Sequence, residues 1–494
     1  MQIGSSVDVS SPVVPEPGPQ QGGLLNRLSV GLFAPVDIAS LVFLRIAFGG
    51  VMLWEVWRYF ENNWIYRYYM RPTVYMTYFG FGWVKPWPGR GMYWHFVALG
   101  VLSVCIAVGY YYRVAAALFF LGFTYVFLLD QTRYLNHFYM ISLLSFLLIF
   151  LPVERAFSLD ARRRPNLHSD TAPAWCLWIV RAQLGIVYFF GGIAKLSSDW
   201  LHGEPMRGWL AARMDFPVIG AYFKEEWMVY QFVIGGLLLD LLIVPLLLWK
   251  RTRVYAFVAA AAFHLLNARL FTIGIFPWFM LLATLLFFPP DLPRRIVRAM
   301  GFVHAARYRR PKRSRKETPA VTASLSLRQK SIVAVLAVYF VVQIFLPLRH
   351  FLYPGDVNWT EEGHNFSWHM KLRDKEGSAS FTISDPDSGQ EWKVNLRKYL
   401  TSRQRSKVVT RPDMILQFSR YLAEEKRREG FENVEVRVRA MTSLNGRERQ
   451  LLIDPTVDLA KQPRNLLPAP WIMPLTEPLV RRDASSKETH TDLD

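Results

Sequence analysis

The sequence predicts a mainly α-helical polytopic membrane protein with a strand-rich α+β domain at its C-terminal end. Two observations support this fold class. Apolar runs of roughly 15–22 residues recur between residues 37 and 348, and such runs are typical of membrane helices. After residue 348 the pattern changes to short alternating segments, which are typical of strands. We therefore expect a transmembrane domain at residues 31–348 and an extramembrane α+β domain at residues 349–475.

The apolar runs define the expected membrane part. Residues 1–30 precede them and are rich in Ser, Pro and Gly, with no basic segment before an apolar core. We expect a disordered tail there and no cleavable signal peptide. The runs expected to cross the membrane are residues 38–58, 94–111, 114–129, 138–152, 174–195, 229–249, 254–269, 272–288 and 331–348. Several of them are short, so we expect about eight or nine transmembrane helices.

The net charge of +19 is concentrated in the connections between these runs. Residues 159–165, 250–253 and 289–330 are rich in Lys and Arg. Basic connections lie on the cytoplasmic side of membrane proteins. Nine spans with a cytoplasmic N-terminus place all three segments in the cytoplasm and everything after residue 348 outside. We expect no nucleic-acid partner; a DNA-binding loop at 289–330 is the weaker alternative, and contact with anionic membrane lipid is another.

The C-terminal part combines strands with one amphipathic helix. Apolar side chains repeat at helical spacing between Pro412 and Gly430, so this segment is expected to be a helix. The expected strands are residues 378–384, 390–396, 433–444 and 449–455. Residues 476–494 are expected to form a second disordered tail.

The chain has only two cysteines, Cys105 and Cys176, and both lie in or beside apolar runs. This excludes a disulfide framework and a thiolate cluster for zinc or iron–sulfur. The sequence contains no nucleotide-binding loop, nucleophile elbow or zinc motif. We therefore expect no metal cofactor.

Lys195 lies in YFFGGIAKLSSDW (188–200), near the end of an apolar run. Ionisable residues in membrane segments usually face the interior and mark function. The functional interpretation is a neutral amine that acts as a base, because desolvation disfavours the charged form. Gly191 and Gly192 would let another helix or a flat ligand come close. The alternative is that Lys195 reaches the membrane interface beside Asp199 and Trp200.

Two histidines lie in or at the ends of other runs. His137 stands at the outer start of one run, and His264 lies well inside another. Each has a simpler interpretation as a hydrogen-bonded histidine at an interface or in a core. In the expected topology, however, both lie at about the depth of Lys195. Three ionisable groups from three segments would then line one cavity, and we expect that convergence.

Five segments in order resemble the vitamin K-dependent gamma-glutamyl carboxylase family, with its HTTM membrane domain and its lumenal domain. They are YLNHFYM (134–140), YFFGGIAKLSSDW (188–200), FHLLNARLFTIGIF (263–276), FLPLRHFLYPGDVNWTEEGHNFSWHM (345–370) and RQLLIDPTVDLA (449–460). The resemblance extends from about residue 35 to about residue 475.

The resemblance implies a defined chemistry. The family oxidises reduced vitamin K with O2 to the epoxide, and the strong base formed on the way removes a γ-proton from a substrate glutamate. CO2 then captures the carbanion to give γ-carboxyglutamate. Lys195 falls on the catalytic lysine, the base that deprotonates the hydroquinone. His137 falls on a histidine that supports carboxylation, and His264 with Asn267 matches a further histidine motif.

The resemblance also implies binding residues and partners. We expect Tyr188, Gly191, Gly192, Asn136 and Asn267 to bind the reduced quinone, which is phylloquinol or menaquinol. The co-substrates are O2 and CO2, and the partner is a glutamate-containing protein or peptide. The low cysteine count departs from animal members and indicates a bacterial member. The expected location is the bacterial inner membrane, or the membrane of the endoplasmic reticulum if the source is eukaryotic.

Two other functions remain open at this point. One is a quinone epoxidase that lacks glutamate carboxylation; the presence of His137 beside Lys195 disfavours it weakly. The other is a non-enzymatic module for membrane transport or partner binding. Transporters often contain paired, glycine-interrupted helices in two halves, and we find no such pairing.

Overall fold

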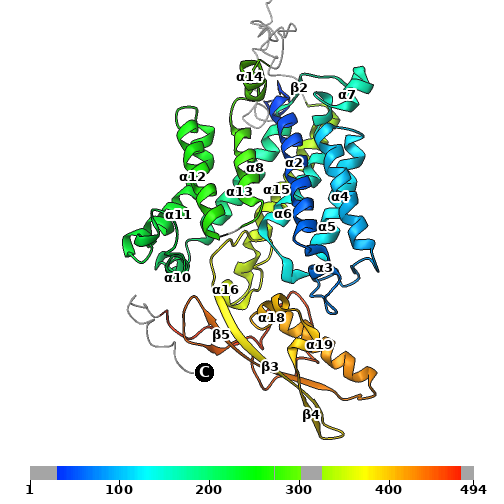
Figure 1. The fold of residues 1–494 in the computed structure, drawn as a ribbon, viewed down its shortest axis with the longest axis vertical. Helices are drawn as coiled ribbons and strands as arrows, with labels where there is room; N and C mark the ends of the chain where they lie inside the picture. Colours follow the sequence, from blue (N-terminus) through cyan, green and yellow to red (C-terminus); the bar gives the residue numbers. More distant parts are fainter. Residues whose placement is uncertain (1–30, 272, 302–324, 480–494) are drawn as a thin grey trace, which may run out of the picture.

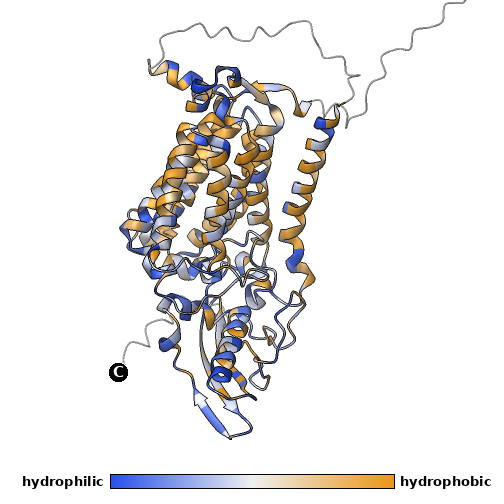
Figure 2. Cartoon of the chain, turned by 90° about the vertical axis from the view of Figure 1, so that its right-hand side faces the viewer, coloured by the Kyte–Doolittle hydropathy of each residue, from blue (hydrophilic) through white to orange (hydrophobic). Residues whose placement is uncertain are grey.

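Two parts of the chain are stacked along the long axis of the molecule, a helical bundle and a sheet domain (Figure 1). The computed structural model describes residues 31–271, 273–301 and 325–479. Hydrophobic residues dominate the bundle, whereas the sheet domain is largely hydrophilic outside its core (Figure 2). The predicted N-terminal tail and most of the basic connection 289–330 lie outside the described residues.

Each of the nine predicted spans corresponds to a helix or to most of one. They are α2 (Ala39–Glu61), α4 (Gly91–Val108), α5 (Tyr112–Leu128), α6 (Asn136–Phe150), α8 (Ala174–Ala194), α11 (Glu226–Leu248), α12 (Arg253–Phe271), α13 (Phe276–Thr284) with the 3-10 turn η5 (Leu285–Phe287), and α15 (Leu327–Leu348). The fold class is therefore confirmed.

The number of helices that can cross a membrane unaided is smaller than nine. By length and hydropathy, six of the described helices qualify: α2, α4, α8, α11, α12 and α15. A seventh forms if α13–η5 and α14 (Leu292–Ala299), which meet at a bend of 101°, make one broken span. Helices α5 and α6 are apolar but shorter. The prediction of eight or nine spans was a count of apolar segments, and an apolar segment can form a helix that is too short to pass the length criterion for a membrane span.

Shorter elements connect these helices at the two ends of the bundle. They are β1 (Pro35–Asp37), α3 (Trp64–Tyr69), η1 (Gln131–Arg133), η2 (Val153–Arg155), α7 (Leu159–Arg163), η3 (Pro165–Leu167), β2 (Thr171–Pro173), α9 (Ser198–Leu201), α10 (Met206–Ala211), η4 (Gly220–Tyr222), η6 (Arg349–Leu352) and α16 (Val357–Thr360). Strands β1 and β2 pair antiparallel and join the start of the bundle to the start of α8.

Aromatic packing holds the centre of the bundle together. The Phe48 ring on α2 lies edge-on to Phe119 of α5 and to Phe279 of α13, with centroids 5.6 and 6.4 Å apart. Such edge-to-face pairs contribute about 0.5–1.5 kcal/mol beyond the burial of their area. The two cysteines, Cys105 on α4 and Cys176 on α8, are both free.

Helix α15 lies at the side of the bundle (Figure 2), and most of its apolar side chains are not buried. Val335, Val338 and Phe345 are 64–68% exposed. The Tyr339 hydroxyl donates to Gln183 Oε1 of α8 at 2.7 Å and links the helix to the bundle. An apolar helix with so much exposed surface is typical of contact with lipid.

The sheet domain contains four antiparallel strands in the order β4-β3-β5-β6. They are β3 (Lys375–Asp385), β4 (Gln390–Lys393), β5 (Glu435–Leu444) and β6 (Gln450–Leu451). The helices are α17 (Leu396–Tyr399), α18 (Ser402–Val408) and α19 (Pro412–Arg428). Helix α19 packs on the sheet through Phe418, whose ring lies 5.1 Å from that of Phe381. The predicted helix at 412–430 and the predicted strands at 378–384 and 433–444 are therefore confirmed, whereas the strands predicted at 390–396 and 449–455 are shorter, at Gln390–Lys393 and Gln450–Leu451.

The two parts share a core. Val74 and Met76, in the loop after α3, are buried in the hydrophobic cluster of the sheet domain. Gln417 on α19 accepts a hydrogen bond from the Thr77 amide at 2.8 Å. At the other end of the domain, Gln450 binds the amides of Thr476 and Glu477. Residues 476–479 of the predicted tail are thus attached to the domain, and the remainder lies outside the described residues.

Candidate active site

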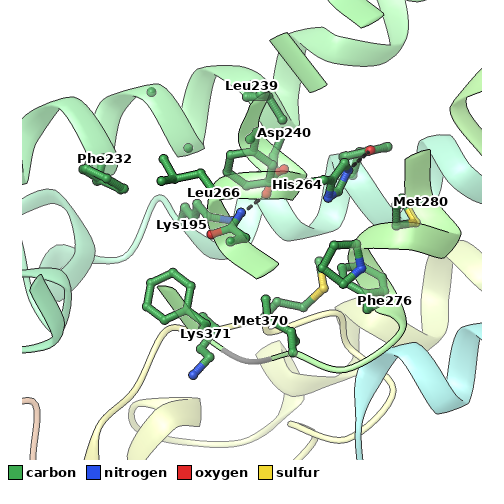
Figure 3. A pocket seen from close by; sticks show the side chains of 18 of the residues that line it. Lys195, Phe232, Leu239, Asp240, His264, Leu266, Phe276, Met280, Met370 and Lys371 are labelled. Atoms are coloured by element: carbon green, nitrogen blue, oxygen red, sulfur yellow. Dashed lines mark hydrogen bonds and ion pairs between the residues drawn. The ribbon is translucent and has the colours of Figure 1, made fainter. Parts of the chain in front are cut away.

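A cavity of about 370 Å³ lies between α8, α11, α12, α13 and a loop that precedes the sheet (Figure 3). Its walls are mainly apolar and include the rings of Phe232, Phe263, Phe271 and Phe276. The polar groups are few, and Lys195 is among them. Ligand sites of this kind have a mostly apolar wall and a small number of polar groups that set orientation.

Lys195 forms a buried ion pair with Asp240. Lys195 follows the last turn of α8, and Asp240 lies in the middle of α11. Lys195 Nζ donates to Asp240 Oδ2 at 2.5 Å and to the carbonyl of Gly191 at 3.2 Å. The two side chains are only 7% and 5% exposed. The amine therefore points into the protein, and the alternative in which it reaches the interface beside Asp199 does not describe the structure.

Asp240 is a residue that the sequence analysis missed. It is a lone carboxylate in the apolar segment GGLLLDLLIVP, and the rule that drew attention to Lys195 applies equally to it. Removing one member of a buried ion pair leaves an uncompensated charge, which typically costs about 3–5 kcal/mol. Because the two groups are in direct contact, one proton can also move between the amine and the carboxylate without a water molecule.

His264 and Tyr188 form a second polar contact on the same cavity. The Tyr188 hydroxyl lies 2.7 Å from His264 Nε2, and both residues are buried. Asn267, about one turn after His264 on α12, also lines the cavity. The structure thus brings four of the predicted site residues to one cavity: Lys195, Tyr188, His264 and Asn267.

His137 does not line this cavity. Its ring lies 5.7 Å from that of Phe276, and Phe276 in turn lies 6.2 Å from the ring of His264. Phe276 is therefore a neighbour of both histidines. The predicted convergence of three ionisable groups in one cavity was correct for Lys195 and His264 and wrong for His137. Equal depth along the membrane did not fix which way the side chain faces.

Asn136 also lies apart from the cavity. Its Nδ2 donates to the carbonyl of His369 at 2.9 Å, and its Oδ1 accepts from the Tyr134 hydroxyl at 2.8 Å. Trp368 beside it stacks on Tyr139 of α6 with centroids 4.9 Å apart. In this structure Asn136 holds the loop at 366–371 against α6.

The two glycines before Lys195 let α8 and α11 approach each other. A Cβ on Gly192 would stand 2.6 Å from Leu241 Cδ2, and one on Gly191 would stand 3.2 Å from Asp240 Oδ2. Neither glycine lines the cavity. The expectation that they admit another helix is met by α11, and the close approach is what allows Asp240 to reach Lys195.

The described residues hold no cluster of three or more His, Cys, Asp or Glu side chains arranged for a metal ion. The polar groups that line the cavity include an amine, a carboxylate, an imidazole and a phenol, from Lys195, Asp240, His264 and Tyr188.

Comparison with known families covers both parts of the chain. The HTTM domain model matches residues 33–292, which is more than half of the chain. The model of the vitamin K-dependent gamma-carboxylase lumenal domain matches residues 328–478. The chain belongs to the vitamin K-dependent gamma-glutamyl carboxylase family. No solved structure matches it.

The lumenal domain of this carboxylase-family protein contributes to the cavity. Met370 and Lys371, which lie within the lumenal-domain match, line it from the side opposite α11 (Figure 3). Lys371 Nζ lies 5.0 Å from the ring centroid of Trp209 and 4.9 Å from that of Phe271. The cavity is therefore built by both domains, which the sequence could not show.

A buried salt bridge fixes the lumenal domain close to Lys195. Arg447 binds both carboxylate oxygens of Asp199 on α9, at 2.6 and 2.7 Å. Asn445 Nδ2 donates to the same carboxylate at 2.8 Å. All three residues are at least nine-tenths buried. This carboxylase-family protein thus holds its two domains in register only four residues after Lys195.

Proposed function

We propose that this chain is a vitamin K-dependent gamma-glutamyl carboxylase that couples vitamin K epoxidation to carboxylation of peptidyl glutamate. The observation that supports this most strongly is the Lys195–Asp240 pair on an apolar cavity between the membrane helices and the lumenal domain. The task of the amine is to take a proton from a hydroquinone hydroxyl, for which it must be neutral.

Asp240 supplies a route to that neutral amine. Ionised pairs are poorly stabilised away from water, since the desolvation of both charges offsets their attraction. When the shared proton lies on the Asp240 carboxyl, Lys195 Nζ has a free electron pair and is a general base. Asp240 then holds the proton until the product leaves.

The cavity fits a planar quinone. Its volume of about 370 Å³ lies within the range of small-molecule sites, and phenyl rings form much of its wall. Tyr188 and His264 present polar groups along the wall, and Asn267 adds an amide. These residues would orient the quinone oxygens. Bound reduced vitamin K supplies, together with O2, the strong base that removes the γ-proton of glutamate.

Exclusion of water is the second task of the protein. A strong base is quenched by bulk water, so the reacting groups must be kept dry. The apolar walls on α11, α12 and α13 do this from the membrane side, and Met370 does it from the lumenal domain. Gly191 and Gly192 contribute by allowing the helices to close on the pair.

The glutamate substrate enters from the side of the lumenal domain. Lys371 stands at that side of the cavity and carries the charge that a glutamate carboxylate would meet first. His137 and Asn136 support the carboxylation half indirectly, His137 through its neighbour Phe276 and Asn136 through the loop at 366–371, rather than by direct contact with the amine.

The orientation follows from charge. The basic elements α7 and α14 lie at the end of the bundle opposite the lumenal domain (Figure 1). The positive-inside rule then places that end in the cytoplasm, together with the N-terminus, and the lumenal domain outside it. We propose the bacterial inner membrane as the location, since a chain with only two cysteines departs from the animal members that the sequence resembles; the membrane of the endoplasmic reticulum would apply if the source is eukaryotic.

The test uses purified protein in nanodiscs with reduced vitamin K, labelled bicarbonate and a glutamate-containing peptide. Epoxide and label in the peptide are followed together for wild type, for Lys195→Ala and for the exposed control Lys224→Ala. We expect wild type and the control to form both products and Lys195→Ala to form neither. Epoxide without label would identify an epoxidase. Neither product in folded wild type would favour the binding or transport module.

A further inference from the structure

A second, strongly basic cavity lies at the junction of the bundle and the lumenal domain, away from Lys195. Its volume is about 290 Å³, and four arginines line it: Arg67, Arg71, Arg133 and Arg403. Arg67 and Arg71 lie in and just after α3, Arg133 ends η1, and Arg403 opens α18. Three segments far apart in the sequence thus bring four positive charges to one place.

The single acid in this cavity does not balance that charge. Asp130 is buried, and it accepts hydrogen bonds from the Thr132 amide at 2.9 Å and from Gln404 Nε2 at 3.2 Å. Burial raises the pKa of Asp130 to about 6, but even when it is fully ionised this single carboxylate faces four guanidinium groups. Among the described residues, no carboxylate lies within 4 Å of any of the four guanidinium groups.

Arg133 carries the clearest sign of a missing partner. Its guanidinium stacks on the Tyr68 ring at 3.3 Å, which fixes its position. Its Nε and Nη1 atoms are buried and have no hydrogen-bond partner among the described residues. A buried donor without an acceptor is destabilising, and more so when it is charged. An anion in the cavity would remove that cost.

The position of the cavity indicates which kind of anion it binds. Arg67 follows the outer end of α2, and Arg133 lies between α5 and α6, so the cavity lies where the apolar helices end. Residues of α3 and α18 line the same cavity, and both helices lie at this boundary (Figure 1). On the same side, Trp57, Phe60 and Tyr66 are 40–65% exposed on α2 and α3. Exposed aromatics at helix ends are typical of the headgroup region of a bilayer.

We propose that Arg67, Arg71, Arg133 and Arg403 bind the phosphate of an anionic phospholipid headgroup from the extracytoplasmic leaflet. Guanidinium groups bind phosphate through paired, charge-assisted hydrogen bonds. Basic pockets at helix ends are a recognised way for membrane proteins to hold anionic lipid. The bound lipid would join α3, η1 and α18, and so connect the bundle to the lumenal domain.

An acidic peptide offers the same charge but fits the location less well. Carboxylates of a peptide would approach from water, whereas this cavity adjoins exposed tryptophan, phenylalanine and tyrosine side chains on lipid-facing helices. The acyl chains of a phospholipid would cover those rings while the phosphate entered the cavity.

The test measures lipid binding by the full chain in neutral detergent, using native mass spectrometry. The probes are phosphatidylglycerol, phosphatidylcholine of the same chain length, inorganic phosphate and a glutamate-rich peptide. The site variant is Arg133→Gln/Arg403→Gln. The matched control is Arg162→Gln/Arg164→Gln, which removes two exposed arginines at the opposite end of the bundle. Because either variant could affect folding, the single variant Arg71→Gln at an exposed position is measured as well.

We expect phosphatidylglycerol to bind wild type and the control alike and phosphatidylcholine to bind both much more weakly. The Kd for phosphatidylglycerol should rise roughly 30-fold in the site variant and about 5-fold in Arg71→Gln, as expected for about 1 kcal/mol per arginine. Equal affinity in the site variant and wild type would overturn the proposal. Inorganic phosphate binding as tightly as the lipid would replace the lipid by free phosphate, and displacement of the lipid by the peptide would replace it by an acidic partner.

Discussion

Lys195 and Asp240 meet across the contact between α8 and α11, with Nζ 2.5 Å from Oδ2 and both side chains almost fully buried. Forty-four residues separate them in the chain; Asp240 lies in a helix that is long and apolar enough to cross a membrane, and Lys195 directly follows another. Charges at such positions are costly and usually mark function. The pair therefore gives the sharpest tests of the proposed mechanism.

Asp240→Asn removes the acceptor for the lysine proton and keeps the shape of the side chain. We expect the rate of epoxide formation to fall at least about 10²-fold, which is the usual contribution of a general base. Asp240→Glu should restore part of the rate and shift its pH profile, which a merely structural role would not do. Rates at saturating hydroquinone between pH 6 and pH 9 provide the measurement.

A double variant separates activity from folding. Lys195→Met/Asp240→Leu replaces the ion pair with apolar side chains, and such replacements are often neutral or stabilising. We expect a melting temperature at or above that of wild type together with no activity. A wild-type rate in Asp240→Asn would contradict the role of Asp240, and Asp215→Asn, at an exposed carboxylate, is the matched control.

The sequence predicted the site residues that stand out in their own apolar segment, and it missed the features that depend on contacts between helices. Lys195 and His264 were found because ionisable groups in apolar runs stand out one at a time. Asp240 stands out equally, but its importance lies in the pairing of α11 with α8, and one sequence does not record which helices touch. The prediction that His137 lines the cavity was wrong for a related reason. The depth of a residue follows from its position along a helix, whereas the direction of its side chain, here toward Phe276, depends on how the helix is rotated.

The same distinction between local patterns and long-range contacts holds for the fold. Nine helices followed from hydropathy, and the strands β3 and β5 followed from alternation, because both patterns are local. The burial of Val74 and Met76 in the core of the lumenal domain did not follow, since that loop reads as an ordinary connection. The Asp199–Arg447 bridge also joins residues 248 positions apart. Contacts between distant segments account for most of what was missed.

Gly192→Ala tests the close approach of α8 and α11. The added Cβ would stand 2.6 Å from Leu241 Cδ2 and 3.2 Å from the Leu241 amide nitrogen, so α11 must move. We expect a loss of about 1–3 kcal/mol in stability, as for overpacking of a core, and a fall in epoxide formation because Asp240 moves with α11. Melting temperature and rate are measured together.

Gly50→Ala is the control for that variant. Gly50 lies within α2, and a Cβ there would meet no atom within 4 Å. Its melting temperature should stay at the wild-type value or rise slightly, because alanine favours the helix more than glycine does, and its rate should stay at the wild-type value. If Gly192→Ala behaved in the same way, the close contact between the two helices would not be needed to hold the ion pair.

Arg447→Gln tests the attachment of the lumenal domain. The variant leaves the buried Asp199 carboxylate with only the hydrogen bond from Asn445. Loss of one partner of a buried pair typically costs about 3–5 kcal/mol. We expect faster hydrogen exchange in α9 and in the loop that carries Met370, and weaker binding of a glutamate peptide. Arg437→Gln, at a half-exposed arginine of β5, should leave both unchanged. Unchanged exchange in α9 would show that other contacts hold the domain.

Lys375 gives a prediction about pH. It lies at the start of β3 with its side chain 5% exposed, 3.6 Å from Glu361, and it donates to the Trp359 carbonyl at 2.5 Å. Burial lowers the pKa of Lys375 from its ordinary value of 10.5 to about 7, although Glu361 opposes this. Between about pH 7 and pH 10 the unfolded chain therefore holds a proton that the folded chain has lost. The free energy of unfolding should rise with pH across this window, by up to about 1.4 kcal/mol per pH unit.

Lys375→Met removes that titration and should flatten the rise. The measurement is the melting temperature of wild type, Lys375→Met and the control Lys393→Met, an exposed lysine of β4, at intervals from pH 6.5 to pH 9.5. Groups that titrate in all three proteins cancel in the differences. We expect wild type and the control to gain stability relative to Lys375→Met as pH increases. Three parallel curves would mean that Lys375 keeps its proton in the folded protein, held there by Glu361.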